Sequence, residues 1–79
     1  MRKHTVTVSV GEVYRSLPST LRTKDAENAV NDEVKRRFER QGIEFMDKPG
    51  LYPVPPCKMT RYKQGGSHVI TISQWMGDA

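Results

Sequence analysis

The side chains that could supply a nucleophile, a general base or a metal ligand are few and widely spaced. The chain has 79 residues with two histidines, His4 and His68, and one cysteine, Cys57. If the segments on either side of Gly65-Gly66 form a hairpin, Cys57 and His68 lie roughly 20 Å apart along it, too far for a Cys–His pair. No pair of residues has the spacing of a metal site. We therefore expect a protein that is not an enzyme and has no metal or cofactor.

Cys57 cannot form a disulfide within the chain, because it has no second cysteine to pair with. The simpler interpretation is a small, partly buried side chain. The alternative is an intermolecular disulfide in an oxidised homodimer, which a non-reducing gel would detect.

The first element expected from the pattern is a strand over residues 4–10, HTVTVSV. Apolar and hydroxyl side chains alternate strictly there, as they do in a strand with one buried face. Residues 11–23 are ambiguous, because Pro18 interrupts them, and they fit either a short helix or an irregular strand. The residues expected to point inward are Val6, Val8 and Val10.

A helix is expected over residues 25–41, where apolar residues recur every four positions. Asp25 or Thr23 can cap its start, and Gly42 suits the position after its end. The oppositely charged pairs Asp32–Arg36 and Glu33–Arg37 have the favourable i,i+4 orientation, with the acid nearer the start of the helix. The apolar stripe consists of Ala26, Val30, Val34 and Phe38.

After this helix, residues 43–46 are a candidate strand, and residues 49–56 place four prolines in eight positions. Proline is excluded from helix interiors and central strands. We expect a stiff, extended crossover whose Leu51, Tyr52 and Val54 pack on the core; the alternative is that they present an apolar ridge to a partner. A P-x-x-P motif ending at Pro56, followed by Lys58, also fits ligands of SH3 domains, but the pattern is short.

Residues 57–63 and 67–75 are expected to form a β-hairpin that turns at Gly65-Gly66. The two-residue loop fixes the register, because Tyr62 then opposes Val69. One face carries Met59 with Ile70 and Ile72 and should join the core. The other face should show its side chains to solvent or to a partner: Lys58, Thr60, Tyr62, Thr71 and Trp75.

These elements predict an α+β fold with a single domain, residues 1–79, in which one amphipathic helix packs on a small, mainly antiparallel sheet ending in a β-hairpin. With 35% apolar residues, the chain can build one small core and no buried catalytic cavity. No stretch approaches the ~20 apolar residues that cross a bilayer, and no signal peptide is recognisable. We expect a cytoplasmic protein that does not bind membranes.

The net charge of +4 is concentrated in residues 1–24, which alone carry +4, with a second basic run at residues 58–63. Such bases, next to aromatic side chains, suit contact with acidic protein surfaces or with phosphates. Arg37 lies within the apolar arc of the helix, either paired with Glu33 or presented to a partner. The predicted partner-binding residues are Arg2, Lys3, Arg22, Lys24, Lys58, Thr60, Tyr62 and Trp75.

The alternating strand HTVTVSV, the helix DAENAVNDEVKRRF and the terminal hairpin, in one small domain without a chemical site, resemble small phage-encoded anti-CRISPR proteins. The resemblance is one of type, without a shared motif, and assigns no functional residue. It implies an inhibitor that binds a nuclease or its guide-RNA–protein complex in a bacterial cytoplasm. Many such inhibitors are acidic and mimic DNA. This chain is basic, which implies binding to acidic protein or to nucleic acid in the complex.

Two further interpretations remain open from the sequence. The first is a small basic nucleic-acid-binding domain that uses the same bases. The second is a structural protein that assembles into a homodimer through its strand edges.

Overall fold

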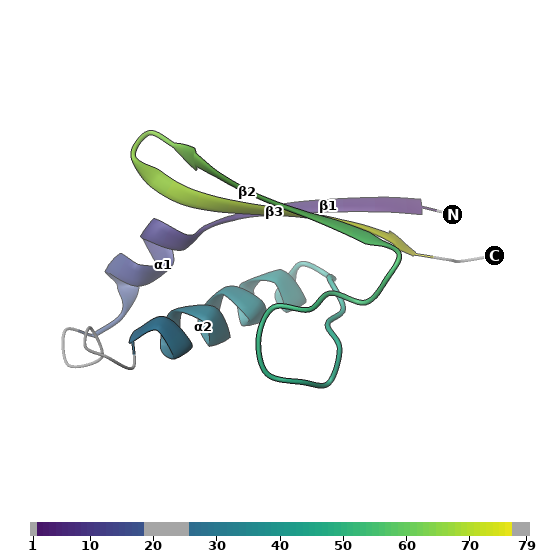
Figure 1. Ribbon diagram of the computed structural model, residues 1–79, viewed down its shortest axis with the longest axis horizontal. Coiled ribbons are helices and arrows are strands. Elements are labelled where there is room, and N and C mark those ends of the chain that lie inside the picture. Colours follow the sequence, from purple (N-terminus) through teal and green to yellow (C-terminus); the bar gives the residue numbers. More distant parts are fainter. Residues whose placement is uncertain (1, 19–25, 77–79) are drawn as a thin grey trace.

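The computed structural model describes residues 2–18 and 26–76 of the chain. Three strands form one antiparallel sheet in the order β1-β3-β2 (Figure 1). The predicted α+β class is confirmed, with two helices instead of one. The elements are β1 (Arg2–Ser9), α1 (Val10–Ser16), α2 (Ala26–Arg40), β2 (Cys57–Gln64) and β3 (Ser67–Met76).

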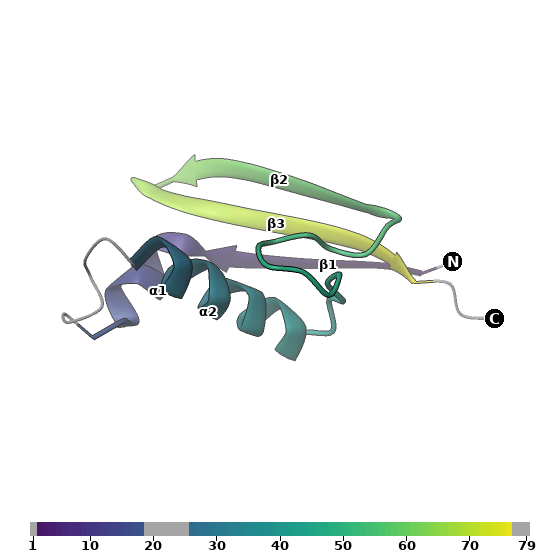
Figure 2. The same ribbon diagram turned by 60° about the horizontal axis from the view of Figure 1, so that its bottom comes forward.

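Both helices and the loop after α2 lie on the same side of the sheet, and the other side is left open (Figures 1 and 2). The core fills the space between these two layers. Its centre is completely buried, with Val13 of α1, Val34 and Phe38 of α2, and Ile72 of β3 all 0% exposed. A domain this small has only one such cluster to stabilise it.

The prediction that the first strand extends to Val10 is wrong, because a helix begins there. The Ser9 side chain accepts a hydrogen bond from the Glu12 backbone N–H and caps α1. A Cβ added to Gly11 would lie only 3.0 Å from the Ser67 hydroxyl, so glycine lets α1 approach the start of β3 closely. The first part of the ambiguous segment 11–23 is helix to Ser16, before Pro18, and residues 19–23 lie outside the described residues.

Helix α2 matches the predicted helix to within one residue at each end. Val30, Val34 and Phe38 are buried against the sheet, and Gly42 has a φ of 97°, as a glycine after a helix often does. The capping residues proposed for its start, Thr23 and Asp25, lie outside the described residues.

The acidic side chain that pairs with both neighbouring arginines is Glu33. It contacts Arg36 at 3.2 Å and Arg37 at 3.7 Å. Among the described residues, the predicted pair Asp32–Arg36 is not formed, since Arg36 turns to Glu33 instead.

The predicted hairpin register is confirmed at every pair, with Tyr62 opposite Val69, Thr60 opposite Thr71 and Met59 opposite Ile72. Gly65 and Gly66 form the turn with φ values of 59° and 81°. Two successive residues with positive φ are what a two-residue hairpin loop needs.

The predicted strand over residues 43–46 is wrong, and so is the extended crossover. Phe45 forms only an isolated bridge with Pro53, because the proline segment folds back on the chain that precedes it. The Met46 N–H donates to the Tyr52 carbonyl at 2.7 Å and closes this loop. Of the side chains expected to pack on the core, Leu51 is 7% exposed, whereas Tyr52 points outward and is 48% exposed.

Gln74 of β3 holds this loop against the sheet. Its side chain accepts from the Glu44 N–H at 2.9 Å and donates to the carbonyls of Glu44 at 2.8 Å and Val54 at 3.0 Å. It is the only buried polar residue among those described. The backbone of residues 43–46 is therefore bonded both to the Gln74 side chain and to the backbone of the proline segment, whose Val54 N–H donates to the Glu44 carbonyl at 3.0 Å.

Candidate functional site

The surface of the sheet that faces away from both helices is here called the open face (Figure 2). It is built by alternate residues of the three strands, since successive side chains of a strand point to opposite sides. The register places its members in cross-strand rows. They are Lys3, Thr5 and Thr7 of β1, Lys58, Thr60 and Tyr62 of β2, and Val69, Thr71, Ser73 and Trp75 of β3.

Hydroxyl groups connect the strands across the open face. The Thr5 and Ser73 hydroxyls lie 3.0 Å apart, and the Thr7 and Thr71 hydroxyls lie 2.9 Å apart. The Tyr62 hydroxyl lies 3.2 Å from that of Thr71 and so extends the network to β2. The face is therefore polar along its middle and offers hydroxyl donors and acceptors to a partner.

Two aromatic residues flank this hydroxyl network. Tyr62 is 41% exposed, and the bond to Thr71 holds its ring in one position. At the other end, the Lys3 ammonium lies 5.8 Å from the centroid of the half-buried Trp75 ring, within the range of a cation–π contact. Because these side chains are already fixed in position by their neighbours, they lose less conformational entropy when a partner binds.

The charge on the sheet has only one sign. The three strands contain five basic residues and no aspartate or glutamate, so the acidic residues that the structure describes belong to the helices and loops. Such a one-signed field attracts anionic partners and speeds their encounter. The basic residues of the sheet are Arg2, Lys3, Lys58, Arg61 and Lys63.

The structure brings together five of the eight predicted binding residues. Arg2 is exposed at the start of β1, but its register position puts it on the opposite side from Lys3. Arg22 and Lys24 lie outside the described residues. The five that share the open face are Lys3, Lys58, Thr60, Tyr62 and Trp75.

Sequence reasoning missed the hydroxyl residues of β1 as part of this surface. The alternation over residues 4–10 puts Thr5 and Thr7 on the outer face of their strand, but it does not predict that this strand pairs with β3. Both strands show alternating Thr or Ser, but several offsets match these alternations equally well, so the sequence does not select the register with Thr7 opposite Thr71.

Of the three side chains that could take part in chemistry, His4 and Cys57 contact backbone carbonyls and His68 is exposed on β3. Among the described residues, no group of three His, Cys, Asp or Glu side chains could hold a metal ion. His4 Nε2 contacts the Gln41 carbonyl at the end of α2, and the Cys57 thiol contacts the Pro53 carbonyl at 3.4 Å. His4 and Cys57 flank Gln74 in the register, so that buried amide separates them.

The proline segment does not have the form of an exposed SH3 ligand. Pro53 is buried and bridges to Phe45, and Lys58 already belongs to β2. In the described part of the chain, no helix is long and apolar enough to cross a membrane.

Comparison with protein families, with curated proteins and with solved structures gives no match to this chain. The functional argument therefore depends on the geometry and charge of the surfaces described above.

Proposed function

We propose that this protein is a non-catalytic binding protein that covers an anionic surface of a protein or nucleoprotein partner with its open face. The observation that carries the proposal is the absence of any acidic residue from the three strands, together with Lys3 and Lys58 on the face itself. A partner that presents carboxylates or phosphates is attracted to such a face.

The aromatic side chains add contact energy that charge alone does not supply. Tyr and Trp are the residues most enriched among those that dominate binding free energy at interfaces. Tyr62 and Trp75 stand on a rigid sheet, and each has a neighbour that holds it, Thr71 and Lys3 respectively. We expect them to anchor the partner, with the threonines between them supplying hydrogen bonds.

Within this proposal, the best candidate for the biological role is inhibition of a bacterial defence complex in the manner of the anti-CRISPR proteins. A small, rigid, basic face suits the blocking of an acidic protein surface or of guide RNA in such a complex. The proposal requires no chemical step, in keeping with the engaged positions of His4 and Cys57.

Direct binding of nucleic acid is the second candidate, and one observation favours it. Aromatic and basic side chains share one exposed sheet face, as in domains that stack unpaired bases on a sheet. Tyr62 and Trp75 would stack on bases, and Lys3 and Lys58 would contact phosphates.

Capture from a bacterial lysate on the tagged protein, with and without nuclease treatment, tests the proposal. We expect a specific partner that is retained by the wild type and lost by the double variant Tyr62→Ala/Lys58→Ala. Loss of capture after nuclease treatment would select the nucleic-acid candidate. Equal capture by wild type and variant would contradict the assignment of the open face.

A salt titration on the captured complex separates the two candidates further. Binding to phosphates weakens log-linearly with salt concentration, with a slope that counts the contacts made. Binding to a protein through aromatic anchors should depend on salt less steeply.

A further inference from the structure

A second surface of the molecule, which adjoins the open face and shares Thr5 and Thr7 with it, is the free edge of β1. Within the described residues β1 pairs only with β3, so its outer edge presents unpaired backbone groups. The edge of β2 is protected by Lys58, Arg61 and Lys63, as charged side chains often protect edge strands. Residues 5–9 of β1, TVTVS, carry no charge at all.

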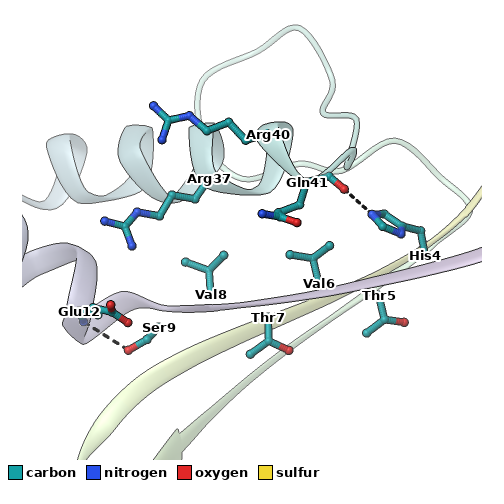
Figure 3. Close-up of a pocket in the computed structure, with 10 residues that line it drawn as sticks. All are labelled: His4, Thr5, Val6, Thr7, Val8, Ser9, Glu12, Arg37, Arg40 and Gln41. Carbon is teal, nitrogen blue, oxygen red and sulfur yellow. Dashed lines mark hydrogen bonds between the residues drawn. The ribbon is translucent and has the colours of Figure 1, made fainter.

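A groove of about 600 Å³ runs along this edge. It is lined by all six residues from His4 to Ser9. Since successive side chains alternate in direction, a groove that touches all six must follow the edge of the strand and not one of its faces. Figure 3 shows Val6 and Val8 pointing toward α2 and the two threonines pointing away. Six residues of extended chain span roughly 20 Å.

The wall opposite β1 is basic. Arg37 and Arg40 of α2 line the groove. Arg37 contacts Glu33 at 3.7 Å, but Glu33 also contacts Arg36 at 3.2 Å, so its charge is shared. Arg40 is exposed and has no ion pair among the described residues.

The acidic side chain that lines the groove comes from α1. Glu12 belongs to the first turn of α1, beside Ser9 (Figure 3). The charged residues that line the groove are thus two arginines of α2 and one glutamate of α1. An anionic occupant would place its charges beside Arg37 and Arg40.

We propose that this groove binds an extended segment of a partner protein, which adds as a fourth strand to β1 and carries carboxylates toward Arg37 and Arg40. Strand addition supplies main-chain hydrogen bonds, and alternate side chains supply specificity. Side chains two residues apart on one side of a strand are about 7 Å apart. Residues three apart on a helix have Cβ atoms about 5–6 Å apart, so two such carboxylates can each reach one arginine.

A second copy of this chain is a poorer occupant. Its own β1 has no acidic residue and begins with Arg2 and Lys3. Pairing of two β1 edges would add bases to a groove that already holds Arg37 and Arg40, and would leave both arginines without a carboxylate.

The test uses a blocked seven-residue peptide that alternates threonine with glutamate, and the same peptide with lysine for glutamate. We expect the glutamate peptide to bind the full chain at a ratio of one to one and to slow amide hydrogen exchange in β1. The substitution Arg40→Ala should weaken this binding about tenfold. Arg36→Ala, the matched control on the same helix outside the groove, should change it less than about twofold.

Two further measurements separate strand addition from loose charge attraction. N-methylation of the peptide amides along one of its edges should abolish binding, while methylation along the other edge should not, because only one edge can pair with β1. Equal binding of the lysine peptide, or equal binding of both methylated forms, would overturn the proposal. A concentration-dependent dimer with protected β1 amides would overturn it in favour of self-pairing.

The proposal for the open face and the proposal for the groove can be tested independently. The variant Tyr62→Ala/Lys58→Ala changes only the open face and should bind the glutamate peptide as the wild type does. A loss of peptide binding in that variant would contradict the separation of the two sites.

Discussion

At the scale of single residues, Gln74 best shows how one side chain fixes the path of a loop. Its amide bonds to the backbone of Glu44 and Val54, and thereby holds both sides of the proline loop at β3. The alternation of β3 predicts an inward position for Gln74. The identity of its partners could not be predicted, because a backbone group looks the same at every position in a sequence.

Replacement of Gln74 by leucine should destabilise the protein by about 2–4 kcal/mol, because it removes the side-chain partner of the part-buried Glu44 N–H and Val54 carbonyl. Urea denaturation measures the change, and faster hydrogen exchange at the Glu44 amide would locate it. Gln64→Leu, the same substitution at an exposed site on β2, is the control and should cost less than about 0.5 kcal/mol. Equal shifts for both variants would show that the three hydrogen bonds contribute nothing.

Tyr62 and Tyr52 form a natural pair for testing the open face, since both are exposed but only Tyr62 lies on that face. We predict that Tyr62→Ala weakens binding of the captured partner about tenfold or more. Tyr52→Ala, on the proline loop, should leave the affinity within about twofold of the wild type. Titration calorimetry or interferometry with the purified partner gives both values, and the reverse order would place the interface on the loop side.

At the scale of elements, regular periodicity was enough to predict most of the fold. The alternation of β1, the four-residue repeat of α2 and the Gly65-Gly66 turn led to correct elements, and the hairpin register was predicted pair by pair. Two predictions were wrong where no period exists. Val10 begins a helix because Ser9 caps it, and residues 43–46 bond to Gln74 and to the folded proline segment.

Of the candidate site, the part on the hairpin could be predicted from the sequence, whereas the part on β1 could not. The register places Lys58, Thr60, Tyr62 and Trp75 on one face from sequence alone. The contribution of β1 depends on a pairing between residues more than sixty positions apart, such as Thr7 with Thr71. Local patterns contain no information on such pairings, so the groove beside β1 was beyond prediction as well.

The packing of α2 on the sheet depends most on Phe38, which is completely buried and lies 6.1 Å from the ring of Phe45, centroid to centroid. We predict that Phe38→Ala costs roughly 3–5 kcal/mol through lost burial and the cavity it leaves. Thermal or urea unfolding measures it. Glu39→Ala, the exposed neighbour on the same helix, should cost less than about 0.5 kcal/mol. An unchanged melting temperature for Phe38→Ala would refute the helix-to-sheet packing.

At the scale of the whole molecule, the helical layer and the sheet divide the charge between them. The strands hold five bases and no acids, whereas the rest of the chain holds eight bases and nine acids. A net charge of +4 therefore understates the field at the sheet, where +5 is opposed by a remainder of −1. Two of these five bases, Lys3 and Lys58, lie on the open face, which is left uncovered by helices (Figure 2) and receives no acidic residue from the strands.

The most direct measurement compares two charge-matched variants for binding to the captured partner. Lys3→Gln/Lys58→Gln removes two charges from the open face, and Arg36→Gln/Lys48→Gln removes two exposed charges from the helical side. Both lower the net charge from +4 to +2. We predict that binding is weakened at least about tenfold by the first pair and less than about threefold by the second. Equal losses would mean that net charge alone drives binding, and would contradict the open face as the binding surface.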